Sequence, residues 1–504
     1  MTEKSQRKKE QIMMKQEKKK KRTNRKEQSD ALRLWILGVC AFFIFTCVFM
    51  QMRKRQTAEE KEMEESETGS AVWEEANAER EEREAVSEEQ NEYQNEHKKE
   101  MIIQADRLSA AYDYDEAVGL LKTMEGYESD PEILNKIKEY EAQKASCVPV
   151  NMEEVTHVFY HSLVVDPDRA FANQEKDPQA AGNNQWMTTI YEFEKITQEM
   201  YDRGYVIVGI HDLIETSVDE NGNTQFLPAT IMLPPGKKAY VLSQDDLSYY
   251  HCYDNYGYAA KMILNEDGKP VCDYIQADGT HVTGAYDVVP ILDAFLDEHP
   301  DASYRGAKGV IALTGYNGVL GYRTDASYLD RNGNLDRDKR DWLDEHPEFD
   351  IEQERAEAKR VADAMKADGW EFASHTWGHI RIKDVSLERL MQDTQKWREN
   401  VEPIVGSVDT IVFAHGQDLG DWGAYPESDA KYRYLKEQGY RVFCNVDSNL
   451  YRTWFGRDYL RQGRRNLDGY RIYNNAVGNE NNISDLIDAA EVLDPLRPPV
   501  PKLR

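Results

Sequence analysis

Two histidines four residues apart, His375 and His379, are the residues whose types and spacing best suit metal chemistry in this 504-residue chain. In a helical turn, side chains four residues apart face the same way, so both imidazoles can reach one ion. An acidic pair, Asp245 and Asp246, follows an apolar run upstream. Two imidazoles and a carboxylate make an open metal site with room for a water molecule. Taken alone, the acidic pair also fits a cap or turn after a strand.

The elements that must position these residues alternate between strands and helices. Runs rich in β-branched and aromatic residues predict strands at 155–160, 205–210, 239–243, 309–314, 371–374, 410–414, 441–445 and 470–473. Helical patterns lie between several of them, at 188–203, 288–298, 351–367, 387–400 and 429–438. This alternation predicts a parallel α/β sheet, either open or closed into a barrel.

The candidate side chains share one position relative to the predicted strands. In α/β barrels, chemistry is carried out at the C-terminal ends of the strands. Each candidate follows directly on a predicted strand: Asp245, Asp246, His375, His379 and His415. This placement supports a site independently of the spacing of the two histidines.

Asp245-Asp246, followed by the segment from His375 to His379, resembles the first two motifs of the polysaccharide deacetylases of the NodB-homology type. The H-[S/T]-x-x-H motif is complete, whereas Gln244 stands where the family usually has Phe. The resemblance covers residues 150–490. It implies an irregular (β/α) barrel of seven or eight strands. It also implies a hydrolase that removes N-acetyl groups from a polysaccharide with one divalent metal, zinc or a similar ion.

The resemblance also implies roles for individual residues. Asp246, His375 and His379 correspond to the metal ligands. Asp245 corresponds to the general base, and the nearby cation is expected to keep it ionised.

The family's remaining motifs match less well. Its third motif contains R-x-P-Y, but residues 412–416 read V-F-A-H-G, without Arg or Pro. Of the fourth motif, D-x-x-D-W, Asp447 keeps only the first Asp, and residues 418–422 have the letters at a different place in the chain. The fifth motif supplies a His as general acid, but residues 470–477 contain none. His415 is the candidate replacement for that acid, and a purely structural role fits it equally well.

Several other histidines are more typical of core or loop positions than of ligands and are assigned no role: His157, His161, His211, His251 and His281. Three functions remain open. The leading one is an N-deacetylase that acts on an acetylated polysaccharide. The second is a catalytically weak carbohydrate-binding or envelope scaffold protein on the same fold, which the incomplete motifs favour. The third is an O-acetyl esterase, which needs less protonation of its leaving group.

Charge and hydropathy divide the N-terminal region into segments. Residues 1–55 hold 16 Lys/Arg and 5 Asp/Glu, and the rest of the chain holds 47 and 87. So acidic a body argues against a nucleic-acid enzyme. A basic tail, residues 1–33, precedes an uncharged apolar run, residues 34–52, which as a helix spans about 28 Å. No small-residue cleavage site follows, so a retained anchor is preferred to a signal peptide. The positive-inside rule then predicts a single-pass cell-membrane protein with its N-terminus in the cytoplasm and its catalytic domain outside.

Two short segments follow before the catalytic domain. Residues 53–98 are predicted to be an acidic stalk, because 17 Glu fall between residues 56 and 100. Residues 99–146 have the apolar period of a helical hairpin, with a tetratricopeptide-like turn near Tyr112. Only one such unit is present, so a hairpin packed on the next domain is preferred to a peptide-binding repeat. The catalytic domain spans 150–490, and 491–504 form a C-terminal tail.

Two long loops depart from a plain barrel. Residues 247–287 contain two Asp-Gly turns and a run of tyrosines, for which a glycan platform and hairpin packing both fit. Asp330–Asp336 is similar to a calcium loop, but its Gly is misplaced, and an Asx/Gly turn is preferred. Cys252 and Cys272 could pair across a hairpin, although two free thiols are the preferred interpretation.

Overall fold

The computed structural model describes residues 52, 69–330, 335–420, 423–446 and 453–503. The chain divides into two compact units, Met1–His97 and Lys98–Arg504. Apart from Met52, the described part of the first unit belongs to α2 (Gly69–Ala110), whose residues continue into the second. Among the described residues no helix is long and apolar enough to cross a membrane. Apart from Met52, the predicted anchor at residues 34–52 lies outside the described part of the chain.

Within the described residues of the second unit, seven parallel strands close into a barrel. The order around the ring is β7, β11, β12, β13, β14, β16 and β2, and β2 pairs again with β7. Their bounds are β2 (Thr156–Tyr160), β7 (Lys238–Asp245), β11 (Val310–Leu313), β12 (Glu371–Ser374), β13 (Thr410–Val412), β14 (Val442–Val446) and β16 (Leu460–Asn466). Two strands lie beside the ring: β3 (Tyr205–Ile207) pairs with β7, and β15 (Thr453–Phe455) pairs antiparallel with β16. The predicted α/β class and barrel are confirmed, with seven strands in the ring.

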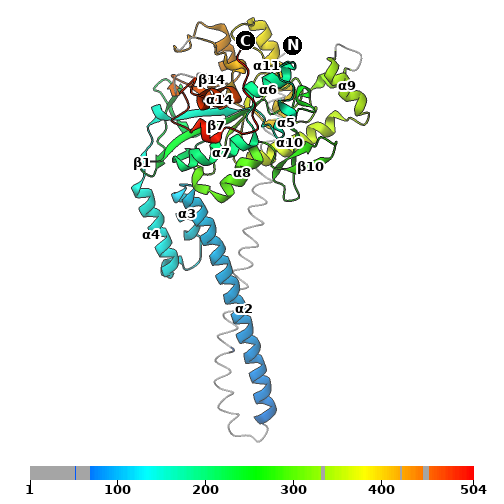
Figure 1. Cartoon of the computed structure of the whole chain (residues 1–504). Coiled ribbons are helices and arrows are strands. Elements are labelled where there is room, and N and C mark those ends of the chain that lie inside the picture. Colours follow the sequence, from blue (N-terminus) through cyan, green and yellow to red (C-terminus); the bar gives the residue numbers. More distant parts are fainter. Residues whose placement is uncertain (1–51, 53–68, 331–334, 421–422, 447–452, 504) are drawn as a thin grey trace, which may run out of the picture. The chain divides into compact units, whose positions relative to one another are not determined.

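Helices cover the outside of the barrel (Figure 1). They include α7 (Ile190–Asp202), α8 (Val288–Glu298), α10 (Ile351–Ala367), α11 (Leu387–Asn400) and α13 (Ala430–Glu437). Each begins where a side-chain oxygen accepts a free backbone N–H of the first turn, as N-caps do. The capping residues are Thr189, Asp287, Asp350, Ser386 and Asp429. The predicted bounds of α8, α10 and α11 are matched residue for residue.

The interior of the barrel changes from apolar to polar along the strands. On β7, Val241, Ser243 and Asp245 alternate with Tyr240 and Leu242, so the two sets face opposite sides of the sheet. Val241 belongs to an interior cluster that also contains small residues of the other strands, and Tyr240 and Leu242 pack under the helices. The polar groups therefore collect at the C-terminal end of the ring, where the site lies.

Short helices pack at the opposite end of the barrel. Besides the last turns of α2 they are α3 (Tyr114–Lys122) and α4 (Pro131–Ser146). Their apolar side chains, such as Leu121 and Ile137, belong to the same buried cluster as the barrel interior. The backbone N–H of Arg305 donates to the carbonyl of Ala111 at 2.7 Å, which ties these helices to the loop after α8.

One predicted strand is wrong. Residues 470–473 belong to a helix, α14 (Gly469–Ala476), which Asp468 caps by accepting the N–H of Arg471. The last strand of the ring is instead β16, whose sequence L-R-Q-G-R-R-N lacks the apolar run typical of a buried strand. It is nonetheless buried along almost its whole length, because its arginines are paired inside the protein.

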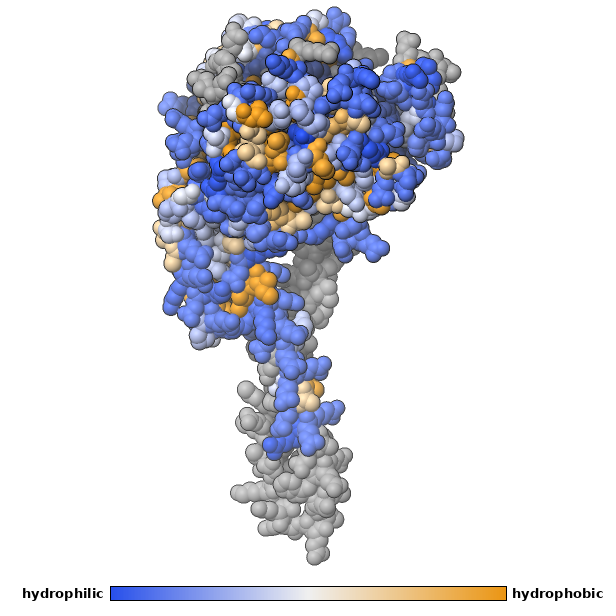
Figure 2. Space-filling model, in the orientation of Figure 1, coloured by the Kyte–Doolittle hydropathy of each residue, from blue (hydrophilic) through white to orange (hydrophobic). Residues whose placement is uncertain are grey.

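The two long loops form structure of their own. A three-stranded antiparallel sheet, β8 (Ala259–Leu264), β9 (Pro270–Ile275) and β10 (His281–Gly284), follows β7, and its turns are the two predicted Asp-Gly turns. In the second loop, Asp336 caps α9 (Arg337–Glu345), while residues 331–334 of the calcium-like segment lie outside the described residues. Cys252 and Cys272 are free thiols. The face shown in Figure 2 is mostly hydrophilic, as the net charge of −29 predicts.

Candidate metal centre

Three predicted ligands converge at the C-terminal end of the barrel. Asp246 follows β7, and His375 and His379 follow β12. One ligand atom from each lies within 4.8 Å of the other two. His379 Nε2 is 3.6 Å from one Asp246 oxygen, and His375 Nε2 is 3.9 Å from the other. The three groups therefore face a common point and fit a divalent ion with a position left open for water.

The backbone that presents these ligands is irregular. The two histidines were expected on a helical turn, but residues 375–379 form a non-helical turn in which Thr376 and His379 have φ values of 65° and 51°. Asp246 also has a positive φ, 60°. Left-handed backbone is uncommon outside glycine and clusters at functional sites. At Asp246 it has a clear use: it lets Asp246 follow Asp245 without pointing to the opposite face of the sheet.

Hydrogen bonds hold the turn and leave the ligand atoms accessible. The backbone N–H groups of Trp377 and Gly378 donate to the buried Asp393 on α11, at 2.7 and 3.0 Å. His375 Nδ1 lies 2.8 Å from the carbonyl of Val412, so this nitrogen carries the proton and Nε2 keeps its lone pair. These are the supporting contacts that a metal-binding imidazole needs.

The third ligand, Asp246, is held as a carboxylate. The Tyr250 hydroxyl donates to Asp246 Oδ1 at 2.5 Å. Burial raises the pKa of Asp246, but the neighbouring His379 and His375 outweigh it and bring the pKa below its usual value. Burial also lowers the pKa of His379, which favours the neutral imidazole. Both protonation states suit metal binding.

Asp245, the expected base, is held by an arginine that the sequence did not point to. Both terminal nitrogens of Arg464 donate to it, Nη1 to Oδ1 at 2.7 Å and Nη2 to Oδ2 at 2.9 Å. The Arg464 side chain is fully buried, and that of Asp245 is 4% exposed. Burial raises the pKa of Asp245, but Arg464, followed by His375, outweighs it and holds the pKa well below its usual range. The chain itself therefore keeps Asp245 ionised.

Arg464 is itself positioned by the neighbouring strands. Its guanidinium carbon lies 4.2 Å from the centre of the Phe159 ring on β2, and its Nη1 also donates to Ser243 Oγ at 3.1 Å. Ser243 in turn lies 2.9 Å from Nε2 of the buried His157. Burial, with a further contribution from Arg464, lowers the pKa of His157 to about 3, so this imidazole is neutral and serves the network by hydrogen bonding.

His161 is the second functional candidate that sequence reasoning missed. It follows β2, two residues beyond Phe159, with which its ring makes an edge contact at 5.8 Å. It stands beyond the C-terminal end of β2, which pairs with β7, the strand that ends in Asp245. The available signal was the two-residue period: His157, Phe159 and His161 occupy alternate positions of a predicted strand and its end.

His415 lies beside the centre on the outer side. Its ring centroid is 4.3 Å from that of His379, and its Nε2 is 3.2 Å from the His379 carbonyl. The residue is exposed and has a φ of 58°. Burial of part of the ring, followed by the nearby His379 and Arg381, lowers the pKa of His415.

Two departures from the family motifs have structural explanations. Gln244, where the family usually has Phe, is buried and donates from Nε2 to Asp287 at 2.8 Å. Asp287 also accepts the Tyr249 hydroxyl, which links the end of β7 to the loop that carries Tyr250. Asp418, in the displaced D-x-x-D-W segment, is buried in an ion pair with Arg461 and accepts the Tyr425 hydroxyl, so its role is structural. Asp447 lies outside the described residues.

Comparison with known proteins adds little to this picture. No protein-family model matches the sequence, and no curated protein is significantly similar to it. Among solved structures, the chain is similar to the Streptococcus pyogenes deacetylase PplD in complex with acetate, with a TM-score of 0.32 and 14% sequence identity. The similarity covers 64% of this chain and 94% of that chain. At this level it carries no argument about the site, so the function is inferred from the site's own geometry.

Proposed function

We propose that this protein is a metal-dependent hydrolase that removes N-acetyl groups from an extracytoplasmic polysaccharide. One observation carries the proposal: an open set of three ligands stands next to a carboxylate that is not needed as a ligand. Asp246, His375 and His379 face a common point, while both oxygens of Asp245 are held by Arg464. Metal-dependent hydrolysis of an amide uses both a metal-binding set and a base that is free to take the proton of the water.

The residues divide the chemistry between them. A divalent ion such as zinc, held by Asp246, His375 and His379, would polarise the acetyl carbonyl and make water a stronger nucleophile. Asp245 accepts the proton of the attacking water, and Arg464 fixes the direction of its lone pairs. The amine that leaves needs a proton on its nitrogen. We assign this donation to His161, which follows β2 beside β7, with His415, whose ring lies 4.3 Å from that of His379, as the second candidate.

Acetate release from N-acetylglucosamine oligomers tests the enzyme proposal directly. We expect Asp245→Asn to remain folded at lower stability, because Arg464 loses its charge partner, to keep the metal and to lose activity by about 10²–10⁴-fold, as for a general base. We expect Asp246→Asn to lose metal and activity together. If the wild-type protein with bound metal releases no acetate from any acetylated oligomer or wall polymer, the enzyme proposal fails and a carbohydrate-binding role takes its place.

The proton donor is identified by comparing two kinds of substrate. An alkoxide-type leaving group departs more easily than an amine, so loss of the acid should slow amide hydrolysis far more than hydrolysis of acetyl esters. We expect this selective loss in His161→Ala and a smaller change in His415→Ala. The reverse order would assign the acid to His415. A wild-type protein that cleaves only acetyl esters would make it an O-acetyl esterase.

We further propose that residues 34–52 anchor the protein in the cell membrane with the catalytic domain outside. The apolar run and its basic N-terminal flank support this topology. Protease added to intact cells without a wall should digest the domain and spare residues 1–30. Protection of the domain would contradict the proposal, and with it the extracytoplasmic substrate.

A further inference from the structure

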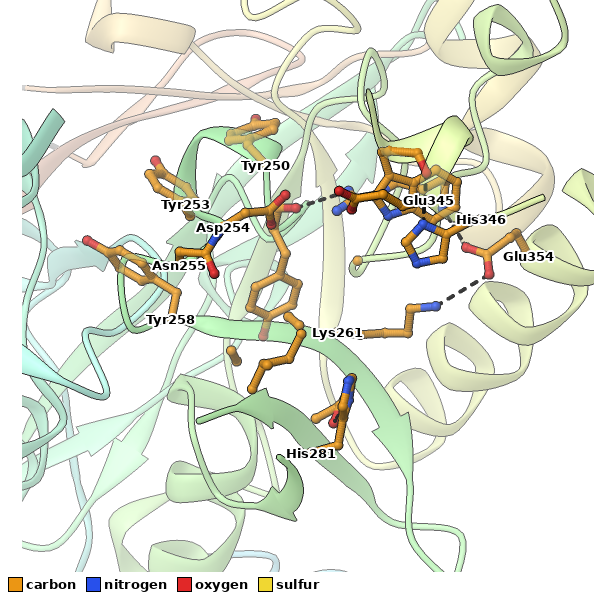
Figure 3. Close-up of a pocket in the computed structure, with 18 of the residues that line it drawn as sticks. Tyr250, Tyr253, Asp254, Asn255, Tyr258, Lys261, His281, Glu345, His346 and Glu354 are labelled. Carbon is orange, nitrogen blue, oxygen red and sulfur yellow. Dashed lines mark hydrogen bonds and ion pairs between the residues drawn. The ribbon is translucent and has the colours of Figure 1, made fainter. Parts of the chain in front are cut away.

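A cavity of about 470 Å³ lies next to the metal centre, between the two long loops (Figure 3). Its size falls within the roughly 300–1,000 Å³ of small-molecule pockets. Tyr250, Tyr253 and Tyr258 stand on one side in Figure 3, with Glu345 and His346 opposite them. The walls come from the sheet β8–β9–β10 and from the segment that joins α9 to α10. Both walls are insertions into the plain barrel.

Two buried polar groups that line the cavity lack hydrogen-bond partners among the described residues. They are Nε of Arg323 and the hydroxyl of Tyr258. Arg323 is 4% exposed and Tyr258 is 5% exposed. Such groups are normally paired, because an unpaired buried polar atom costs about 1–3 kcal/mol. Neither atom is accessible to water, so both belong to the wall behind the surface of the cavity.

The charge of the lining favours a cation. Six carboxylates and three Lys or Arg side chains line the cavity. Several carboxylates are already engaged: Glu354 accepts from Lys261 and from the backbone of Arg323, and Asp273 pairs with His281. Glu345 and Glu348 are exposed carboxylates that also line the cavity, within reach of an arriving ammonium group.

The cavity and the metal centre share structural parts. Tyr250 lines the cavity, and its hydroxyl is bonded to the ligand Asp246. Arg323 also lines it, and its Nη1 donates to the carbonyl of Tyr249 at 3.0 Å. A molecule in the cavity can therefore contact Tyr250, which is hydrogen-bonded to one of the proposed metal ligands.

We propose that this cavity is a subsite for an amine-bearing sugar unit of the polysaccharide, a hexosamine that has lost its acetyl group. The partly exposed ring of Tyr253 takes the apolar face of the sugar ring, and Glu345 and Glu348 attract the ammonium. The inference rests on the proposed function for the identity of the polymer. It implies that the protein prefers chains that are already partly deacetylated.

Binding of three tetrasaccharides without acetyl groups to the full-length protein tests the subsite, since none of them can be deacetylated. We expect a glucosamine tetramer to bind about tenfold more tightly than a glucose tetramer, and a galacturonate tetramer to bind most weakly. E345Q/E348Q should weaken binding of the glucosamine tetramer by about three- to tenfold, as for loss of two exposed charge contacts. Binding of the glucose tetramer should not change. Equal affinity for the glucosamine and glucose tetramers would overturn the proposal.

A matched control separates the cavity from the general acidity of the chain. E141Q/E194Q removes the same charge from exposed positions on α4 and α7, outside the cavity. We expect it to leave binding of the glucosamine tetramer unchanged, and a loss equal to that of E345Q/E348Q would overturn the subsite. The outcome is independent of catalysis. Selective binding without acetate release would overturn the proposed function and support the subsite. Acetate release without selective binding would support the proposed function and overturn the subsite.

Discussion

Replacing Arg464 by Met tests the proposed division between base and metal ligands most directly. The substitution keeps most of the side-chain volume and removes both charged hydrogen bonds to Asp245. Because the pair is almost fully buried, the variant leaves an uncompensated carboxylate in the barrel. Breaking a buried pair in this way costs about 3–5 kcal/mol of stability. Urea denaturation of the wild type and of Arg464→Met measures this loss of stability.

The same substitution changes the chemistry of Asp245. With Arg464 present, the pKa of Asp245 lies well below its usual range. Without it, burial dominates and raises the pKa, so a higher pH is needed to ionise the base. We therefore expect the acid limb of the pH profile for acetate release to move upward in Arg464→Met. The rate at neutral pH should also fall, because the carboxylate is no longer held in one orientation. Loss of an effective base costs about 10²–10⁴-fold.

The adjacent residue provides a matched control. Arg465 lies on the same strand but pairs with Asp485, whose side chain is 49% exposed. In Arg465→Met the freed carboxylate stays hydrated, so the pH profile and the rate should match those of the wild type. Suppose that Arg464→Met remains folded, binds metal, keeps its rate within about twofold of the wild type and keeps its acid limb at the same pH. Asp245 is then not the base that Arg464 holds in place.

Two further predictions concern metal binding and pH. His375→Ala and His379→Ala should each abolish binding of one zinc or similar ion per chain, because two remaining ligands bind weakly; unchanged metal content in both variants, measured by elemental analysis, would contradict the site. At the other end of the barrel, burial lowers the pKa of His211, but its contacts with Asp409 and Glu371 outweigh burial and raise the pKa to about 10. A pKa raised in the folded state stabilises the protein fully below pH 6.5, the unfolded value, and this contribution is lost as the pH rises towards 10. Because the His211 side chain is 46% exposed, we expect its pairing to contribute about 1 kcal/mol to the free energy of unfolding. Between pH 6 and pH 10, the free energy of unfolding measured with urea should therefore fall by that much more in the wild type than in His211→Asn. Equal losses would contradict the pairing.

The parts of the fold that the sequence predicts well are those governed by local rules. The bounds of α8, α10 and α11 follow from apolar periods bracketed by Asp287, Asp350 and Ser386, whose oxygens cap the first turns. Six of the seven ring strands were likewise visible as short β-rich runs, and the three metal ligands follow two of them. Their placement needs only the rule that parallel strands present their C-terminal ends at one edge.

The parts that the sequence hides depend on partners far away in the chain. Strand β16 looks like a charged loop, because Arg461, Arg464 and Arg465 interrupt any apolar pattern. Each arginine can be buried because it pairs with a carboxylate elsewhere in the chain: Asp418, Asp245 and Asp485 respectively. No local rule can reveal such pairs. His161 was missed for a related reason, since its significance appears only when β2 is placed beside β7 in the closed ring.

Arg464 on β16 meets an electrostatic requirement of the proposed base, Asp245. A buried carboxylate that is to act as a base must be kept ionised and aimed, and a guanidinium fork does both. The position of the guanidinium relative to the carboxylate decides its effect, and different strands can supply the arginine. In the closed ring β16 is separated from β7 only by β2, so an arginine that reaches across the Phe159 ring meets Asp245 from inside the barrel. Arg464 therefore makes this contact to Asp245 although residues 412–416 contain no arginine, and Arg464→Met is the variant that tests the proposed role of Asp245.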